Sequence, residues 1–444
     1  MTATKNKVSL RKWLIFIIVG IAGQLAWSLE NMYLNSFLFD LGYSGYQDMI
    51  FWTEALSAIT ACITTLFIGS LTDKIGKRKM FICLGYLLWG ISTAAFGLIN
   101  GENVSVLLNV LEPLKVASIF VVVLDCIMTF FGSSANDASF NSYVTKNVDN
   151  KNRGKVEGVI SVLPLMSMLL ITILYSFTGK EHWDLFFYII GIVVFIAGLI
   201  SLFLIPKEKV EKNNEKFLSI LIEGFKPSTI KKNPSLYIVL ICDLIYCVAA
   251  QVFFPYMIIY FNKTLGFVDV EYLILLGSVL IIGSILAIIG GFILDKTNKT
   301  KMLVPFSIIF IGGCLLITFI NDNLILGIVF GTIMMFGYII MSVVINSLIR
   351  DKTPKGNEGI FQGVRMIFQV ALPMIIGPYI GKTIVSNFST ETYINDFGEI
   401  QNLPNNYIWY VAALIMVLIF IPTIILILKE KKKVNKGIIY DQDQ

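Results

Sequence analysis

The sequence predicts an all-α polytopic membrane protein in which twelve transmembrane helices form two pseudo-symmetric six-helix bundles. Three observations support this prediction: the composition, the number of long apolar runs and an internal repeat. Hydrophobic residues make up 56% of the 444-residue chain and charged residues only 15%, whereas soluble domains carry roughly 25% charged residues. The mean hydropathy is +0.77. Much of the surface is therefore expected to face lipid.

A helix needs about 20 residues to cross the hydrocarbon core of a bilayer. Apolar runs of suitable length predict spans at 13–38, 48–72, 79–99, 116–144, 155–178, 184–205, 235–261, 271–294, 302–320, 323–349, 359–381 and 407–428. The fourth of these has a polar second half, GSSANDASFNSY. The first span is too long for a signal-peptide core and has no small-residue cleavage site, so we expect it to stay in the protein.

The basic residues indicate the orientation of these spans. Of the 35 Lys and Arg residues, 31 fall at the two termini and in alternate loops that would share one side of the membrane. The other side holds Lys115, Lys180, Lys263 and Lys382. By the positive-inside rule, both termini are expected in the cytoplasm, with the protein in an inner or plasma membrane.

A Lys-, Glu- and Asn-rich segment divides the spans six and six. The predicted organisation is an N-terminal bundle at 1–205, a cytoplasmic linker at 206–234, a C-terminal bundle at 235–430 and a tail at 431–444. The two halves resemble each other. GSLTDKIGKRKM from Gly69 aligns with GFILDKTNKTKM from Gly291, a shift of 222, and Asn141 aligns with Asn346 at a shift of 205. Parallel repeats of this kind favour two bundles around a midplane cavity, with alternating access.

Two spans carry polar stripes. The fourth has Asp125, Thr129, Ser133, Asp137 and Asn141 at every fourth position; the first has Gln24, Ser28, Asn31 and Asn35, with Trp27 and Glu30 at the edge. Such spacing places side chains on one helix face. Polar groups inside a membrane face the protein interior, so the stripes are interpreted as walls of a hydrated cavity. The alternative is a set of interhelical hydrogen bonds that hold the bundle together.

The repeat singles out one of the acids. At the shift of 205 the tenth span has Ser342 where the fourth has Asp137, so the carboxylate is not a shared requirement of the fold. Carboxyl groups removed from water favour their neutral form, which suits a proton carrier, and with hydroxyl and amide oxygens they also suit sodium. Asp137 is therefore the first candidate for cation coupling, followed by Glu30 and Asp125. Glu54 is placed at the outer mouth of the cavity.

Several activities are excluded by what the sequence lacks. The six cysteines lie in apolar stretches without a CxxC pair, and His182 is the single histidine, so no metal centre and no cofactor are expected beyond a coupling proton or sodium ion. GPYIGKT from Gly377 is one residue too short for a phosphate loop. Only five of the basic residues are arginines, so no nucleic-acid partner is expected. These features predict that the chain is not an enzyme.

The motif GSLTDKIGKRK from Gly69 resembles the signature between helices two and three of the major facilitator superfamily. This resemblance covers the whole chain and implies a gate role for Asp73, Arg78 and Arg153, with a degraded copy of the motif near Asp295. Two further stretches, GQLAWSL from Gly23 and NDASFNSYV from Asn136, resemble the glycoside–pentoside–hexuronide:cation symporters and the sucrose carriers. The acidic ligands of the symporters' second helix are replaced here by residues such as Ala61 and Thr65.

The resemblance implies a cation-coupled symporter of a sugar or glycoside, embedded in lipid and expected to be a monomer. The expected substrate contacts are Gln24, Trp27, Asn31, Asn141, Asp243 and Tyr246. The expected gate residues are Asp73, Arg78, Arg153, Asp295 and Arg365. Two alternatives stay open at this stage: a proton-coupled drug or metabolite exporter of the same fold, and a non-transporting membrane sensor.

Overall fold

A computed structural model describes residues 8–75, 77–148, 153–179, 181–206, 224–267, 269–295, 297–354 and 358–435. The chain forms two compact units, each described here by itself. The first unit comprises Met1–Phe217 and Glu391–Leu403, and the second comprises Leu218–Thr390 and Pro404–Gln444. The predicted division into bundles, linker and tail stays a prediction, and most of the linker lies outside the described residues.

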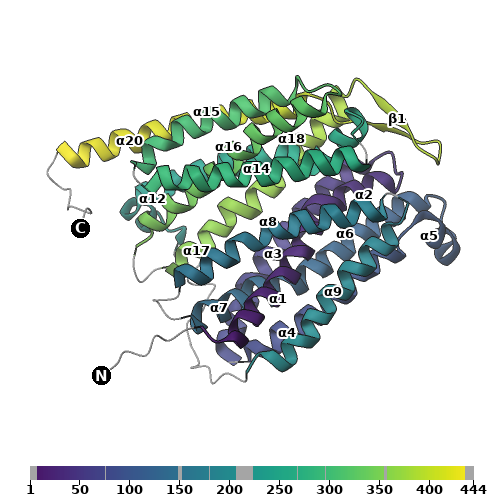
Figure 1. Ribbon diagram of the computed structural model, residues 1–444, viewed down its shortest axis with the longest axis horizontal. Helices are drawn as coiled ribbons and strands as arrows, with labels where there is room; N and C mark the ends of the chain where they lie inside the picture. The colour runs from purple at the N-terminus through teal and green to yellow at the C-terminus, as the bar shows by residue number, and fades with distance from the viewer. Residues whose placement is uncertain are drawn as a thin grey trace. The chain divides into compact units, whose positions relative to one another are not determined.

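The first unit is a helical bundle (Figure 1). Its elements are α1 (Leu10–Ser28), a π-helical turn (Leu29–Tyr33), α2 (Leu34–Asp40), α3 (Tyr46–Ile75), α4 (Arg78–Ala95), a 3-10 turn (Phe96–Leu98), α5 (Gly101–Leu108), α6 (Pro113–Gly132), a π-helical segment (Ser133–Phe140), α7 (Asn141–Asn147), α8 (Arg153–Thr178) and α9 (Trp183–Leu204).

Local interactions determine where several of these helices begin. Asn100 caps α5 by accepting the Asn103 N–H at 2.7 Å, and Pro113 occupies the first turn of α6, where its missing N–H has no cost.

The second unit is also helical. Its elements are α11 (Pro227–Lys232), α12 (Pro234–Phe253), a 3-10 turn (Phe254–Tyr256), α13 (Met257–Ile259), a π-helical turn (Tyr260–Thr264), α14 (Asp269–Asp295), α15 (Lys299–Ile317), α16 (Leu324–Lys352), α17 (Glu358–Met366), a π-helical turn (Ile367–Ala371), α18 (Leu372–Phe388), α19 (Tyr407–Val417) and α20 (Phe420–Asn435). Asn298 and Asn323 cap α15 and α16 in the manner of Asn100.

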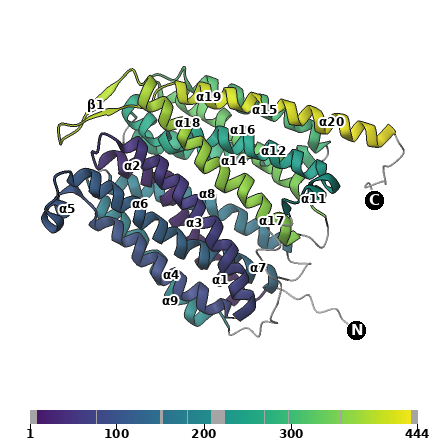
Figure 2. The ribbon, with the colours of Figure 1, turned by 180° about the vertical axis from the view of Figure 1, so that it is seen from behind.

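Small residues allow close helix contacts in both units. α4 and α9 lie side by side (Figure 2), and a Cβ added to Gly90 would lie 2.5 Å from the backbone nitrogen of Phe195. In the second unit, a Cβ on Gly313 of α15 would lie 2.4 Å from Cα of Met334 on α16. These helices pack backbone to backbone, as membrane helices do where burial of apolar surface supplies little driving force.

Within the described residues, eleven helical stretches are long and apolar enough to cross a membrane, and Val162–Thr178 of α8 is a shorter apolar helix. Large apolar side chains such as Phe67, Ile63 and Leu414 are more than half exposed on these helices. Such exposure would be costly in water and is favourable in lipid. The all-helical membrane architecture predicted from composition is therefore confirmed.

A short β-hairpin is a feature of the fold that the sequence analysis did not anticipate. Strands β1 (Thr392–Ile394) and β2 (Ile400–Asn402) pair antiparallel, with Thr392 opposite Asn402. Although the flanking helices α18 and α19 belong to the second unit, the hairpin belongs to the first. It lies at the same end of that unit as α2 and α5 (Figure 1).

Hydrogen bonds fix the hairpin to the turn that follows α2. Gln401 Nε2 donates to the carbonyl of Phe39 at 2.8 Å, and the Tyr46 hydroxyl donates to the carbonyl of Asn402 at 2.6 Å. Asn395 Nδ2 donates to the carbonyl of Gly42 at 2.6 Å. Gly42 has a φ of 89° and packs so closely on the hairpin that a Cβ would lie 2.5 Å from the Phe397 ring. Only glycine fits this turn without strain.

Candidate functional site

Glu30 lies at the centre of a polar group in the first unit. Its Oε1 accepts hydrogen bonds from the hydroxyls of Ser57 at 2.6 Å and Thr129 at 3.1 Å, and these two hydroxyls are 2.8 Å apart. The three residues come from the first, second and fourth spans. Glu30 is 7% exposed, and its Oε2 is buried without a hydrogen-bond partner among the described residues.

A π-helical turn brings Glu30 to this position. The turn covers Leu29–Tyr33 and adds one residue to the helical repeat, which rotates the following side chains relative to an ideal helix. Asn31, expected on the polar stripe, is exposed and donates to the backbone carbonyl of Trp27 at 2.7 Å. Glu30, expected at the edge, is instead buried. The stripe drawn from a uniform helical period is therefore shifted by one residue here.

Asp125 and Glu54 lie close enough to Glu30 to repel it. Asp125 is fully buried on α6, and the charges that act on it are those of Glu30 and Glu54. Neither Asp125 oxygen makes a hydrogen bond of ordinary geometry among the described residues, although the Ser57 hydroxyl is a polar neighbour. Glu54 is 6% exposed and accepts from Asn35 Nδ2 at 2.7 Å. Glu54 is thus buried in the bundle, and the prediction of a place at its outer mouth is wrong.

Asp137 lies at the edge of the same group. It is half-buried in the π-helical segment Ser133–Phe140, accepts from Asn136 Nδ2 at 3.2 Å and interacts electrostatically with Glu30. The Asn136 Oδ1 in turn accepts from the Tyr86 hydroxyl at 3.1 Å. We call Glu30, Glu54, Asp125 and Asp137 the carboxyl cluster.

The other expected substrate contacts of the first unit are more dispersed. Gln24 and Trp27 are half-buried, and the Trp27 ring lies 5.0 Å from that of Trp89. Asn141 is exposed at the start of α7. Within the described ranges, no group of three or more His, Cys, Asp or Glu side chains converges as metal ligands.

The second unit holds a different polar group, in which an arginine is present. Arg365 of α17 donates from Nε to Gln369 Oε1 at 2.8 Å and from an Nη to Asn346 Oδ1 at 2.7 Å. Asp243 of α12, 1% exposed, attracts the guanidinium. We call these four residues the arginine cluster. Gln369 was not foreseen, although its position four residues after Arg365 puts both on one helix face.

The remaining predicted site residues are Tyr246 and the expected gate residues. Tyr246 is buried, donates its hydroxyl to the carbonyl of Tyr338 at 2.8 Å and stacks on the Tyr338 ring at 5.4 Å. Arg78 is buried at the first turn of α4. Asp73, Arg153 and Asp295 lie on α3, α8 and α14, but their side chains are outside the described part of the chain. Their gate roles stay predictions.

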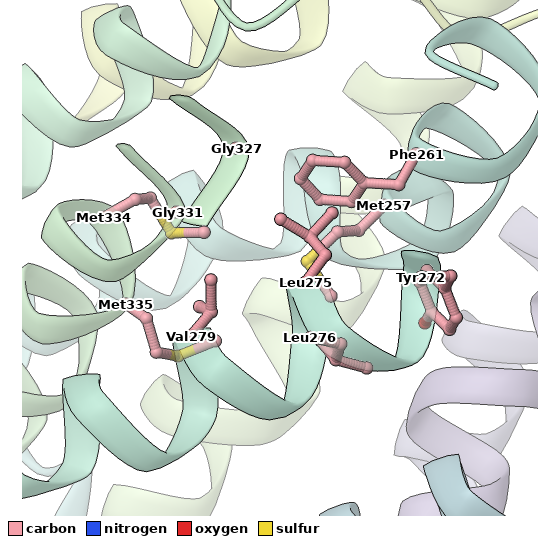
Figure 3. Close-up of a pocket in the computed structure, with 10 residues that line it drawn as sticks. All are labelled: Met257, Phe261, Tyr272, Leu275, Leu276, Val279, Gly327, Gly331, Met334 and Met335. Carbon is pink, nitrogen blue, oxygen red and sulfur yellow. The ribbon is translucent and has the colours of Figure 1, made fainter. Parts of the chain in front are cut away.

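Two hollows in the structure are separate from these clusters. One, in the second unit, is lined by apolar side chains such as Phe261, Leu275 and Met334 that point toward one another (Figure 3) and encloses about 10 Å³. This volume is at the limit for a single water molecule, so the hollow is a packing gap. The other is an open recess of about 500 Å³ in the first unit, lined in part by Glu112, Lys115 and Phe397. Glu112 and Lys115 pair there at 2.8 Å.

Apolar membrane-length helices with polar clusters buried among them define a polytopic membrane protein. The family model of the Major Facilitator Superfamily matches residues 13–378. The chain belongs to this superfamily, which makes it a transporter and not an enzyme. No curated protein sequence matches the chain.

Solved transporters share the fold at low sequence identity. A crystal structure of a point mutant of the nucleoside transporter NupG has a TM-score of 0.72 at 15% identity, over 93% of this chain and 99% of that chain. Another NupG crystal structure gives 0.70 at 14%, over 94% and 99%. An inward-facing, unoccupied bacterial homolog of the human lysosomal transporter Spinster gives 0.65 at 13%, over 95% and 96%. At these identities the likeness concerns the fold alone.

Proposed function

We propose that this chain is a proton-coupled symporter that carries a polyhydroxylated solute, a sugar or glycoside in the first place, by alternating access of its two halves. The observation that carries the proposal is the carboxyl cluster. Its members face one another, and the charges acting on Glu30 and Asp125 come from other carboxyl groups. The distribution of basic residues supports a cytoplasmic location for both termini.

Like charges buried together are stable only when cations neutralise them. In the carboxyl cluster the Asp125 oxygens and Glu30 Oε2 are without hydrogen-bond partners among the described residues, so they offer sites where protons add without displacing a bond. Glu30 Oε1 is held by two hydroxyls, which fixes the orientation of the carboxyl group. Because these unpartnered oxygens can accept protons, we take a proton as the coupling ion and test sodium beside it.

Two considerations favour a polyhydroxylated substrate. Side-chain amides, which donate and accept hydrogen bonds as sugar hydroxyls do, occur in or beside both clusters, as with Asn35, Asn136 and Gln369. The stretches from Gly23 and Asn136 resemble the sucrose and glycoside carriers. NupG, named as a nucleoside transporter, has a similar fold, and a nucleoside also presents ring hydroxyls. Nucleosides therefore belong in the same substrate panel.

The test is uptake by proteoliposomes of labelled sugars and nucleosides, driven in turn by a proton gradient and by a sodium gradient. We expect accumulation with the proton gradient. The variant Glu30→Gln should lose gradient-driven accumulation about tenfold or more but keep counterflow, which exchanges substrate without net ion movement. Glu102→Gln, the same change at an exposed position on α5, should behave as the unmodified protein, and Asp137→Asn measures the contribution of the cluster's edge.

Each of the other readings predicts a different result. If Glu30→Gln accumulated substrate as well as the unmodified protein, the carboxyl cluster would not take part in coupling. If accumulation depended on sodium alone, the coupling ion would be sodium and not a proton. An exporter would empty vesicles against the gradient instead of filling them. A membrane sensor would give no flux with any member of the panel.

A further inference from the structure

The arginine cluster has hydrogen-bonding capacity that its own contacts do not use. A guanidinium has five N–H donors in a planar fork, and Arg365 uses one on Gln369 and one on Asn346. The remaining donors make no hydrogen bond to the described residues. Arg365, Asn346 and Gln369 are all half-buried, so this polar edge reaches the accessible surface of the unit.

The charge of Arg365 is compensated from behind. Asp243 attracts the guanidinium but makes no contact ion pair with it among the described residues. Its Oδ1 has only a long contact of 3.7 Å from the Cys247 thiol, and its Oδ2 has no partner. Because a contact carboxylate would occupy the fork of the guanidinium, the separation leaves that fork open while Asp243 offsets part of the positive charge of Arg365 and of the nearby Arg350.

The fold itself does not require this cluster. In the repeat register that aligns Asn141 with Asn346, the first-half residues at the positions of Arg365 and Gln369 are Ile160 and Pro164. The first half therefore has an apolar residue and a proline at the two aligned positions. Gln369 also lies in the π-helical turn Ile367–Ala371, a local distortion that is frequent at functional sites.

An aromatic ring lies on the same face as Asn346. Tyr338 precedes it by eight residues on α16, about two helical turns. It is half-buried, and its ring is backed by the buried Tyr246 at 5.4 Å and by Phe254 at 5.0 Å. The Phe310 ring lies 6.2 Å from that of Tyr338 as well, so three aromatic neighbours hold Tyr338 in place.

We infer that Arg365 is a substrate-contacting residue that binds an uncharged, acceptor-rich group such as vicinal hydroxyls, with Asn346 and Gln369 orienting it and Asp243 neutralising it. The inference rests on the proposed function and deepens it by naming the group of the substrate that the second unit recognises. A compensated guanidinium favours neutral acceptors over anions, because an anion would add a negative charge beside the carboxylate of Asp243.

The experiment is counterflow of labelled sucrose and labelled uridine in proteoliposomes, with KM and Vmax determined separately. Arg365→Lys keeps the charge opposite Asp243 but loses the planar fork, so we expect KM to rise about tenfold or more with Vmax little changed. Arg350→Lys, the same change at an exposed arginine of α16, is the matched control and should leave KM unaltered.

A second variant covers the case in which Arg365→Lys does not fold. Gln369→Leu removes the acceptor that holds Nε and should raise KM about threefold or more. An unchanged KM in either folded variant would overturn the inference. Counterflow needs no ion gradient, so it is independent of the carboxyl cluster. Absence of counterflow with both probes in the unmodified protein would instead contradict the proposed function.

Discussion

The two units bury their acids in opposite ways. In the first unit Glu30, Glu54 and Asp125 face other carboxyl groups, and hydroxyls and an amide are their hydrogen-bond donors. In the second unit Asp243 faces a guanidinium. The helices around them are similar in length and apolar character. The difference therefore comes from a few side chains and not from the architecture that the two halves share.

This contrast separates two tasks within one fold. A group of acids without a basic partner changes its charge when protons arrive, which is what coupling requires. An acid near a guanidinium is attracted to a fixed positive charge, and that guanidinium presents hydrogen-bond donors of fixed geometry, which is what recognition requires. On the proposed function, the carboxyl cluster of the first unit would bind the driving proton and the arginine cluster of the second unit would contact the solute.

The largest expected effect is on stability, from removing the cation of the second unit. Arg365→Met would leave Asp243 buried without its counter-charge, and we expect a loss of about 3 kcal/mol of stability, seen as a lower Tm of the purified protein in detergent. The double variant Asp243→Asn with Arg365→Met should recover most of this loss, since no buried charge remains. If the double variant were as unstable as the single one, packing of the arginine side chain would be the cause.

A smaller and opposite effect is expected in the first unit. Asp125→Asn removes a buried carboxyl group that has no basic partner among the described residues, so stability should stay the same or rise by about 1 kcal/mol. Gradient-driven uptake should nevertheless fall about tenfold, because one of the proton-binding groups is gone. Thermal unfolding and proteoliposome uptake measure the two quantities on one preparation. If Asp125→Asn lost as much stability as Arg365→Met, the two units would not differ in how they stabilise their buried acids.

The spans and the residue types of both clusters were predictable from the sequence, because membrane helices carry few polar residues and those few are conspicuous. Glu30, Asp125, Asp137 and Asp243 were all identified in this way. Their partners were harder to predict. Which hydroxyl meets Glu30 depends on how helices pack, and the one-residue shift at Leu29–Tyr33 follows from a π-helical turn that a uniform period does not predict.

Two errors have related physical reasons. Glu54 was placed at the cavity mouth because an acid near the end of a span is usually solvated; the structure buries it against Asn35, nineteen residues earlier in the chain. The hairpin Glu391–Leu403 was missed altogether. Its partners, Phe39, Gly42 and Tyr46, are more than 300 residues away, and short polar strands give no periodic signal of such pairing.

The smallest predicted effect concerns the border between the two units at this hairpin. Tyr46→Phe removes the hydrogen bond from the Tyr46 hydroxyl to the carbonyl of Asn402, which should weaken the attachment of the hairpin by about 1 kcal/mol. Amide hydrogen exchange in Thr392–Asn402 should become faster. The matched control is Tyr260→Phe in the second unit, whose hydroxyl donates to Asn406 Oδ1 at 2.5 Å, just beyond the hairpin. Because the hairpin is held by the first unit, the control should leave its exchange unchanged. Equal acceleration in both variants would mean that both units hold the hairpin, and not the first unit alone.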